Sequence, residues 1–202
     1  MKVNYTQQRS IEWHEFKNGK IGGTRLSKVI SGVKNRLIFD LINEQLSGYI
    51  AEDSYIDEDI QFGIDNESIA RDLYSEQSGI EFIEVGCIVS ETSDIHLASP
   101  DGLNIERGIV LEIKCTQNGA IHLERYFNGV EKNYMSQVIN YFVVSDDVEQ
   151  VHWLSYCPYR PERPLIPIIF LRDSFQKEID SARRKIAEIE KTIEQYKSDF
   201  IF

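Results

Sequence analysis

The stretch from residue 96 to residue 115 constrains the fold most, because it places charged side chains inside otherwise apolar runs. Residues 95–99 form an apolar run that leads to Asp101 and Gly102, a pair with turn-forming chemistry. Residues 109–114 form a second run, apolar except for its charged positions. We therefore expect a β-hairpin, with its turn at Asp101-Gly102, inside a sheet.

The charged positions of the second run are Glu112 and Lys114. Side chains of a strand alternate between its faces, so both point one way, while Leu111 and Ile113 point the other. Burying a charged side chain costs free energy unless the charge is paired or holds a metal. If the hairpin brings Asp101 beside Glu112, two carboxylates, the Lys114 ammonium and the Ile113 carbonyl surround one small volume. Hard oxygen ligands of this kind suit Mg²⁺ or Mn²⁺, and the lysine could position or activate a water for attack on a phosphodiester.

The same spacing also fits a simpler structure, a β-hairpin with an Asp-Gly turn and a surface Glu–Lys pair of little energetic value. The glycine-bearing segment at residues 20–27 is equally open to two interpretations. Its glycines and helix-start amides suit an anion, but it lacks the Gly-Lys-Ser/Thr ending of a nucleoside-triphosphate loop. A plain turn between two helices explains it as well.

Composition narrows the class of protein. A chain of 202 residues is most economically one domain, and we expect a core at about residues 10–172 followed by a helix at about 173–198. It has no apolar run of membrane-spanning length, no signal-peptide core, and three scattered cysteines without a CxxC pair, which fit a reducing cytosol. The net charge of −11 means that any phosphate-binding region must be local. The N-terminal 36 residues, which are rich in lysine and arginine, supply one candidate.

Periodicity predicts alternating helices and strands, hence an α/β or α+β fold with a central mixed sheet flanked by helices. Besides the hairpin, we expect helices over residues 10–17, 35–48, 63–77 and 131–144, a β-rich segment at 80–89, strands at 151–156 and 168–171, and a polar loop at 116–120. From residue 173 an apolar seam of heptad type runs to Tyr196. Packing on the domain's own core is its usual explanation, and self-association is the alternative.

Five short motifs follow one another in the chain. They are EWH with Lys17 and GKIGGT in residues 12–24, GIDNESIA with Glu67 in 63–70, ASPDGL in 98–103, LEIKC in 111–115, and YMSQV in 134–138. In this order they resemble the phage lambda exonuclease and YqaJ-like viral recombinase nucleases, a branch of the PD-(D/E)xK superfamily. The resemblance covers about residues 10–160 and implies a restriction-endonuclease-like core. Each motif alone is weak, but five in order are specific.

The resemblance implies a role for each matching residue. Asp101 and Glu112 would ligate the metal with the Ile113 carbonyl, Lys114 would be the catalytic lysine, and Glu67 would be an additional acid on the metal or on a water. Gln137 would also lie at the site. Candidates for phosphate contacts are Ser99 and Thr24, together with Lys17, which stands where the family places an arginine that holds the 5′-phosphate, and Arg25 as a possible substitute further on.

The activity implied is that of a Mg²⁺- or Mn²⁺-dependent exonuclease. Such enzymes degrade the 5′-ended strand of linear duplex DNA and leave a 3′ overhang for a single-strand-annealing partner. Lambda-type members form a ring of three around DNA, and a ring would need a basic surface only in its channel. We expect the protein to act in the cytoplasm of a bacterial or phage-infected cell and to have no membrane partner. Two alternatives are an endonuclease or repair nuclease with the same catalytic residues, and a non-catalytic acidic scaffold or inhibitor.

Overall fold

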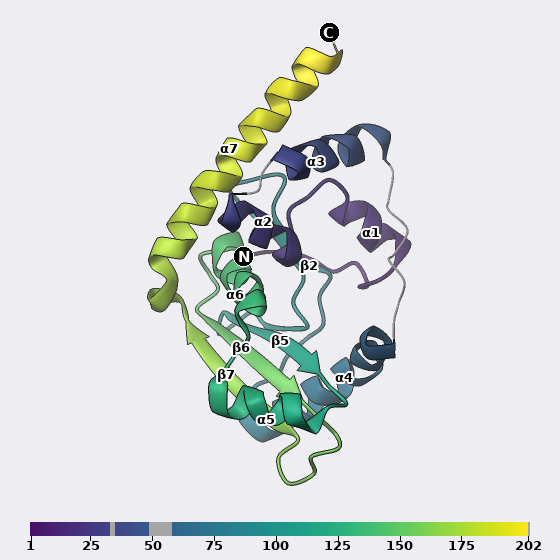
Figure 1. Ribbon diagram of the computed structural model, residues 1–202, viewed down its shortest axis with the longest axis vertical. Coiled ribbons are helices and arrows are strands. Elements are labelled where there is room, and N and C mark those ends of the chain that lie inside the picture. Colours follow the sequence, from purple (N-terminus) through teal and green to yellow (C-terminus); the bar gives the residue numbers. More distant parts are fainter. Residues whose placement is uncertain (33–34, 49–57, 202) are drawn as a thin grey trace.

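The computed structural model describes residues 1–32, 35–48 and 58–201. These residues form a mixed α/β fold with two sheets and a long C-terminal helix (Figure 1). The α-helices are α1 (Ile11–Lys17), α2 (Gly23–Ser31), α3 (Asn35–Ser47), α4 (Glu58–Ser78), α5 (Gly119–Asn128), α6 (Met135–Val144) and α7 (Gln176–Ile201), with 3-10 turns η1 (Lys132–Tyr134) and η2 (Arg172–Phe175). None of the described helices is long and apolar enough to cross a membrane.

The larger sheet has the strand order β4 (Gly102–Asn104), β5 (Ile109–Cys115), β6 (Gln150–Tyr156) and β7 (Leu165–Leu171). β5 and β6 are parallel and the other neighbours are antiparallel, so the predicted mixed sheet is confirmed. The connection from β5 to β6 contains α5 and α6, as a parallel pair requires. Pro167 lies in β7, an edge strand, where a missing N–H is tolerated.

The smaller sheet joins β1 (Lys2–Asn4), β2 (Cys87–Val89) and β3 (Leu97–Ala98), all antiparallel. β3 therefore pairs with β2 and not with β5. The turn predicted at Asp101-Gly102 is wrong, because Gly102 opens β4 opposite Leu111. The hairpin turns instead at residues 105–108, where Asn104 Oδ1 accepts the Arg107 N–H and Gly108 has φ +61°. A side chain that hydrogen-bonds to the backbone and a glycine with positive φ are both typical of a tight turn.

Several predicted helices are confirmed. Ser10 caps α1 by accepting the Trp13 N–H, and α3 matches the predicted 35–48 segment almost residue for residue. Within α4, Ala70 and Arg71 are buried, while Ile69 is exposed. The expected loop at residues 116–120 is shorter than predicted, because α5 begins at Gly119, a helix that periodicity did not indicate.

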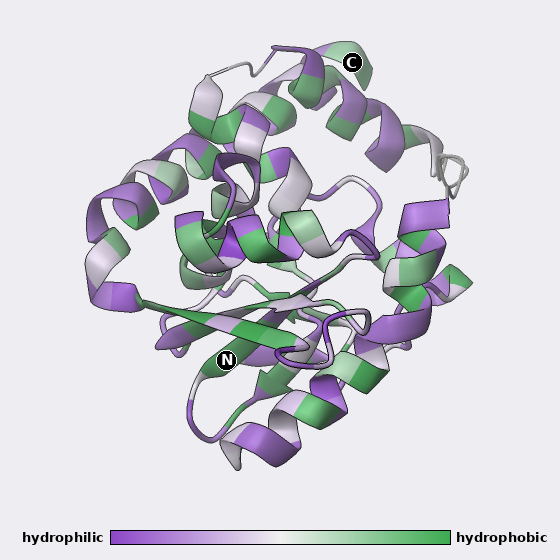
Figure 2. Ribbon diagram, turned by 60° about the horizontal axis from the view of Figure 1, so that its bottom comes forward, coloured by the Kyte–Doolittle hydropathy of each residue, from purple (hydrophilic) through white to green (hydrophobic). Residues whose placement is uncertain are grey.

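α7 packs on the body of the protein along its heptad seam. Ile179, Ile186 and Ile193 are buried in the main core, so packing on the domain's own core is confirmed. In Figure 1, α7 runs along one side of the molecule past α2 and α3 to the C-terminus. Figure 2 shows hydrophobic residues along the strands and alternating hydrophobic and hydrophilic residues along the helices, the pattern of a sheet buried beneath amphipathic helices.

Candidate active site

Glu112 and Lys114 lie on one face of β5, as the alternation predicts; Glu112 is buried and Lys114 is partly buried. Their side chains form an ion pair with each other. The hydroxyl of Tyr141, on α6, donates to Glu112 Oε2 and lies 3.0 Å from the carbonyl oxygen of Ser99. The Glu112 side chain is only 4% exposed, so a surface Glu–Lys pair is excluded. Buried charges of this kind are held in place by their partners.

Asp101 is held by two contacts with the same strand and by a third with Arg71 on α4. Its Oδ2 accepts the Ile113 N–H at 2.6 Å, its own N–H donates to the Leu111 carbonyl at 3.0 Å, and its carbonyl accepts from Arg71 Nη1 at 2.7 Å. Residue 101 precedes β4, so the antiparallel pairing of β4 with β5 delivers its carboxylate to the face of Glu112. The structure thus brings Asp101, Glu112 and Lys114 into one cavity.

The electrostatics of this group follow from burial and mutual charge. Burial first, and then the charges of Glu112 and Glu67, raise the pKa of Asp101 well above its usual range. Burial opposes the charged form of Lys114, but the Glu112 and Asp101 carboxylates together outweigh it and raise the pKa of the ammonium. Burial, followed by the same two carboxylates, raises the pKa of Tyr141, which keeps its hydroxyl a hydrogen-bond donor. The site therefore holds more carboxylates than cations, with the Lys114 ammonium fixed among them.

The cavity has a volume of about 220 Å³ and lies between β5, α6 and the glycine segment. Besides the acids and Lys114, it is lined by Gln8, Arg9, Trp13, Lys17, Gly22, Gly23, Thr24, Leu97, Ser99, Gln137, Asn140 and Tyr141. A Cβ on Gly23 would lie 3.2 Å from Gln137 Cγ, so any other residue at position 23 would require the Gln137 side chain to shift by a few tenths of an ångström. Gln137 Oε1 is buried and has no hydrogen-bond partner among the residues that the structure describes, an arrangement that suits a polar ligand in the cavity.

Glu67, on α4, lies close enough to this group that its negative charge contributes to the raised pKa of Asp101. Its Oε2 is engaged by Arg9 Nη2 at 2.6 Å. In the part of the chain that the structure describes, no three His, Cys, Asp or Glu side chains converge so as to hold a metal by themselves. The donor chemistry still fits Mg²⁺, which proteins commonly hold with only one or two carboxylates, completing the shell with water and substrate phosphate oxygens.

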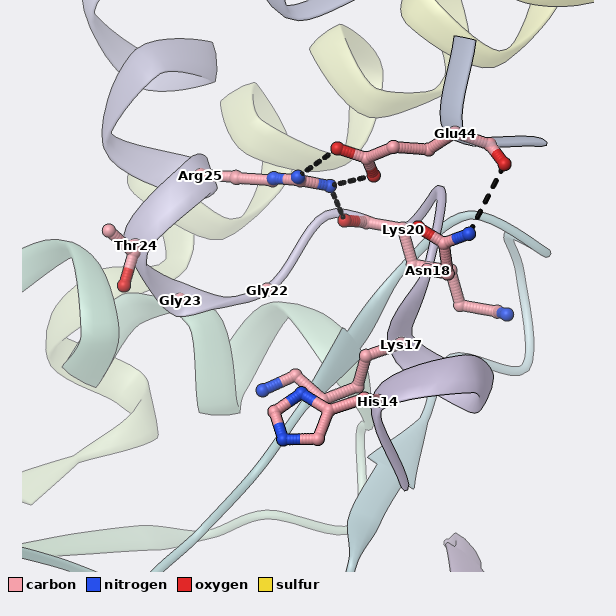
Figure 3. A pocket seen from close by; sticks show the side chains of 9 residues that line it. All are labelled: His14, Lys17, Asn18, Lys20, Gly22, Gly23, Thr24, Arg25 and Glu44. Carbon is pink, nitrogen blue, oxygen red and sulfur yellow. Dashed lines mark hydrogen bonds and ion pairs between the residues drawn. The ribbon is translucent and has the colours of Figure 1, made fainter. Parts of the chain in front are cut away.

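A second cavity, of about 260 Å³, also lies against the glycine segment (Figure 3) and shares Lys17, Gly22, Gly23 and Thr24 with the first. Lys17 and His14 extend into it from α1. Lys17 Nζ lies 3.5 Å from the centroid of the Trp13 ring, a cation–π contact. Thr24 lies at the start of α2, where helix amides favour an anion.

Arg25 is placed differently from our expectation. Its guanidinium forms a bidentate ion pair with Glu44, at 2.5 and 2.8 Å, and also donates to the Lys20 carbonyl (Figure 3). A guanidinium that faces a carboxylate through both arms has little left to offer a phosphate. Arg25 therefore braces the glycine segment against α3, and Lys17 is the cation that the two cavities share.

Sequence reasoning missed three residues of the site. Tyr141 was not predicted to lie at the site, although it follows Gln137 by four positions and so shares its helix face. Arg71 was not singled out, and Asn140, which joins His96 Nε2 at 2.8 Å to the Leu97 carbonyl at 3.0 Å, was also missed. The Gln137–Tyr141 spacing was a usable signal. The other two are recognisable only once the elements are packed.

Comparison with known proteins places these observations in a family. A profile of the YqaJ-like viral recombinase domain matches residues 12–147. The crystal structure of an alkaline exonuclease, LHK-Exo from Laribacter hongkongensis, is 26% identical, with a TM-score of 0.77 over 95% of this chain and 98% of that chain. The same enzyme in complex with dAMP gives 26% identity, a TM-score of 0.76 and the same coverage.

A phage-related exonuclease from Haemophilus somnus 129PT is 15% identical, with a TM-score of 0.60 over 93% of this chain and 99% of that chain. At this identity the similarity concerns the fold alone. No curated protein matches the sequence. The fold similarity extends over nearly the whole length of this chain and of each of these exonucleases.

Proposed function

Because this chain belongs to the YqaJ-like viral recombinase family, we propose that it is a divalent-metal-dependent exonuclease that degrades the 5′-ended strand of linear duplex DNA. The family and the similarity to an alkaline exonuclease make it a phage-type nuclease that acts on DNA. The observation that best supports the finer proposal is the cluster of Asp101, Glu112 and Lys114 in a cavity beside the glycine segment. The polarity and the resulting 3′ overhang follow from the family resemblance.

The metal would be Mg²⁺ or Mn²⁺, held by Asp101 and Glu112 with the Ile113 carbonyl, and Glu67 would be an additional acid. A buried carboxylate such as Asp101, whose pKa is raised by burial and by a neighbouring acid, is the setting in which a hard cation lowers the free energy most. When bound, such a cation polarises the scissile phosphate and lowers the pKa of a coordinated water.

The chain's own residues supply orientation and charge. Lys114, kept protonated by the neighbouring acids, would donate hydrogen bonds to the attacking water or to a phosphate oxygen. Tyr141 holds Glu112 from the opposite side to Lys114 and limits its rotation. Gln137, with its buried and unpartnered Oε1, would position a water or the strand near the scissile bond.

Phosphate contacts would come from Lys17, Thr24 and Ser99, which line the first cavity together. Arg25 is left out of this set because it is paired with Glu44. Lysine binds phosphate as a point charge without the bidentate fork of arginine. We therefore expect the enzyme to favour a 5′-phosphate less strictly than a member with arginine at the position of Lys17.

The net charge of −11 is compatible with DNA binding if the basic surface is local. Lys17, Lys20 and Arg9 line the two cavities, which supports such a local surface. We propose a ring of three chains with the acidic surface outside, and a single-strand-annealing partner that receives the overhang. The enzyme would meet linear duplex DNA in the cytoplasm of a bacterial or phage-infected cell.

End-labelled DNA tests the proposal. Linear duplex carrying a label at either the 5′ or the 3′ end should release the 5′ label first, only with Mg²⁺ or Mn²⁺, while a closed circular duplex stays intact. Cleavage of the circle would instead favour an endonuclease with the same residues. Absence of cleavage together with absence of Mg²⁺ binding would favour a non-catalytic protein.

A further inference from the structure

Arg9 lies in the wall of the catalytic cavity, on the turn that leads into α1. The turn is closed by a hydrogen bond from the Ser10 N–H to the Gln7 carbonyl at 3.2 Å. Gln8 Nε2 donates to the carbonyls of Val85 and Pro100, both at 2.8 Å. Pro100 immediately precedes Asp101, so the Gln8 side chain links the turn that carries Arg9 to the segment next to the acidic cluster.

The backbone of Arg9 has φ +65°, and it is the one non-glycine residue with positive φ in the described chain. It occupies the third position of its turn, where a positive φ favours glycine. A non-glycine side chain costs free energy in this conformation, and such residues are found most often at active sites and ligand-binding positions. Glycine would complete the turn equally well, so the turn alone gives no reason for an arginine.

The side chain of Arg9 has a partner that it can exchange. Its guanidinium pairs with Glu67 at 2.6 Å, yet the Arg9 side chain is 45% exposed, against 16% for Glu67. Ion pairs with one member in solvent contribute little free energy. A guanidinium also matches the oxygens of a phosphate better than most cations do, because it offers two parallel donors.

We propose that Arg9 binds a phosphate of the DNA strand in the catalytic cavity, exchanging Glu67 for that phosphate and so releasing the Glu67 carboxylate toward Asp101. This inference depends on the proposed function, since it needs DNA in the cavity. In the DNA-free protein, Arg9 offsets the charge of a third acid near Asp101 and Glu112. Once a strand is bound, that acid becomes available to a cation or to a water.

The exchange predicts a specific effect on DNA binding, measured without divalent metal so that cleavage does not interfere. Arg9→Gln should weaken binding of linear duplex by roughly tenfold. It should also reduce the slope of log affinity against log salt by about one, the signature of one lost phosphate contact. Arg9→Gly removes the same contact, and glycine adopts a positive φ without strain. It should therefore show the same loss of affinity and of salt slope even if Arg9→Gln folds poorly.

Arg36→Gln is the matched control. It breaks an Arg–Asp ion pair at 2.8 Å on α3, where the arginine side chain is 85% exposed and lies outside both cavities. Its affinity and salt slope should equal those of the wild type. If Arg9→Gly and Arg9→Gln match this control, or lose affinity with an unchanged slope, Arg9 does not bind phosphate and the inference is wrong.

Glu67→Gln tests the exchange itself. Removing the competing carboxylate should tighten DNA binding, and by more when Arg9 is present than in the Arg9→Gln background, which a double-mutant cycle measures. Equal tightening in both backgrounds would mean that Arg9 and Glu67 do not exchange. Cleavage of linear duplex by the wild type, assayed in parallel, shows whether the proposed function holds independently of these results.

Discussion

Glu112 receives two hydrogen-bond donors from opposite sides, Lys114 from its own strand and Tyr141 from α6. The first contact follows from sequence, because residues two apart on a strand share a face. The second does not, since it depends on how α6 crosses the sheet. At this scale the pairing of Glu112 with Lys114 and the approach of Asp101 were predictable, whereas the contacts of Arg9 and Tyr141 were not.

Glu112→Gln and Lys114→Ala should each lower the nuclease rate by about two orders of magnitude or more, because each removes charge from the group that would hold the metal or orient the water. Unfolding midpoints measured beside the rates would separate loss of chemistry from loss of fold. Asp40→Asn, which removes a carboxylate paired with Arg36 on α3, should leave the rate unchanged. Near-normal rates in either active-site variant would refute this mechanism.

His96 should make stability depend on pH. Burial, only partly opposed by its hydrogen bond to Asn140, lowers the pKa of His96 from 6.5 to about 4. The folded protein therefore keeps the ring neutral, so this contribution to stability is complete above about pH 6.5 and is lost progressively as the pH falls toward 4. The loss amounts to about 3 kcal/mol.

Denaturant unfolding of the wild type and of His96→Gln over that pH range measures this contribution. The variant has no group to titrate there, so its stability should fall less steeply with acidification. Parallel curves would show that other groups account for the acid sensitivity of the wild type.

At the scale of elements, the β4–β5 hairpin delivers Asp101 to Glu112 and depends on Gly108. The Gly108 carbonyl accepts the N–H groups of Glu149 and Gln150, which ties the turn to the start of β6. The position of this turn was predicted wrongly because Asp101-Gly102 has turn chemistry of its own. Pairing of Gly102 with Leu111 overrode that local preference.

Gly108→Ala should destabilise the protein by roughly 3 kcal/mol or more, because its Cβ would lie 2.2 Å from the Asp147 carbonyl oxygen, in addition to the strain of a positive φ. Gly79→Ala is the control: Gly79 has φ +67° but no atom within 4 Å of an added Cβ. It should cost only about 1 kcal/mol. Equal losses, measured by denaturant unfolding, would mean that contact with residue 147 does not constrain the hairpin.

At the scale of the whole molecule, the cations that line the cavities belong to an acidic chain. A chain of net charge −11 repels DNA over most of its surface, so binding requires that the acid lie away from the strand. A closed ring of identical chains achieves this, because a head-to-tail interface repeated by rotation places the same face of every chain toward the axis.

Sedimentation at working concentration should therefore give a species of three times the 23.4 kDa chain mass. DNA binding by this species should weaken steeply with added salt, since only a local basic surface contacts phosphate. A monomer that cleaves duplex DNA at the same concentration would contradict the ring.

The sequence by itself determined the family, the mixed sheet, the packing seam of α7, and which acids and which lysine lie on one strand face, because these follow from local periodicity and from the order of motifs. Only the tertiary structure decided that Arg25 pairs with Glu44, that Tyr141 holds Glu112, and that Arg9 pairs with Glu67. Each of these contacts joins residues at least 19 positions apart, brought together by the packing of separate elements. Local sequence preference carries no information about such contacts, because their free energy exists only once the chain is folded.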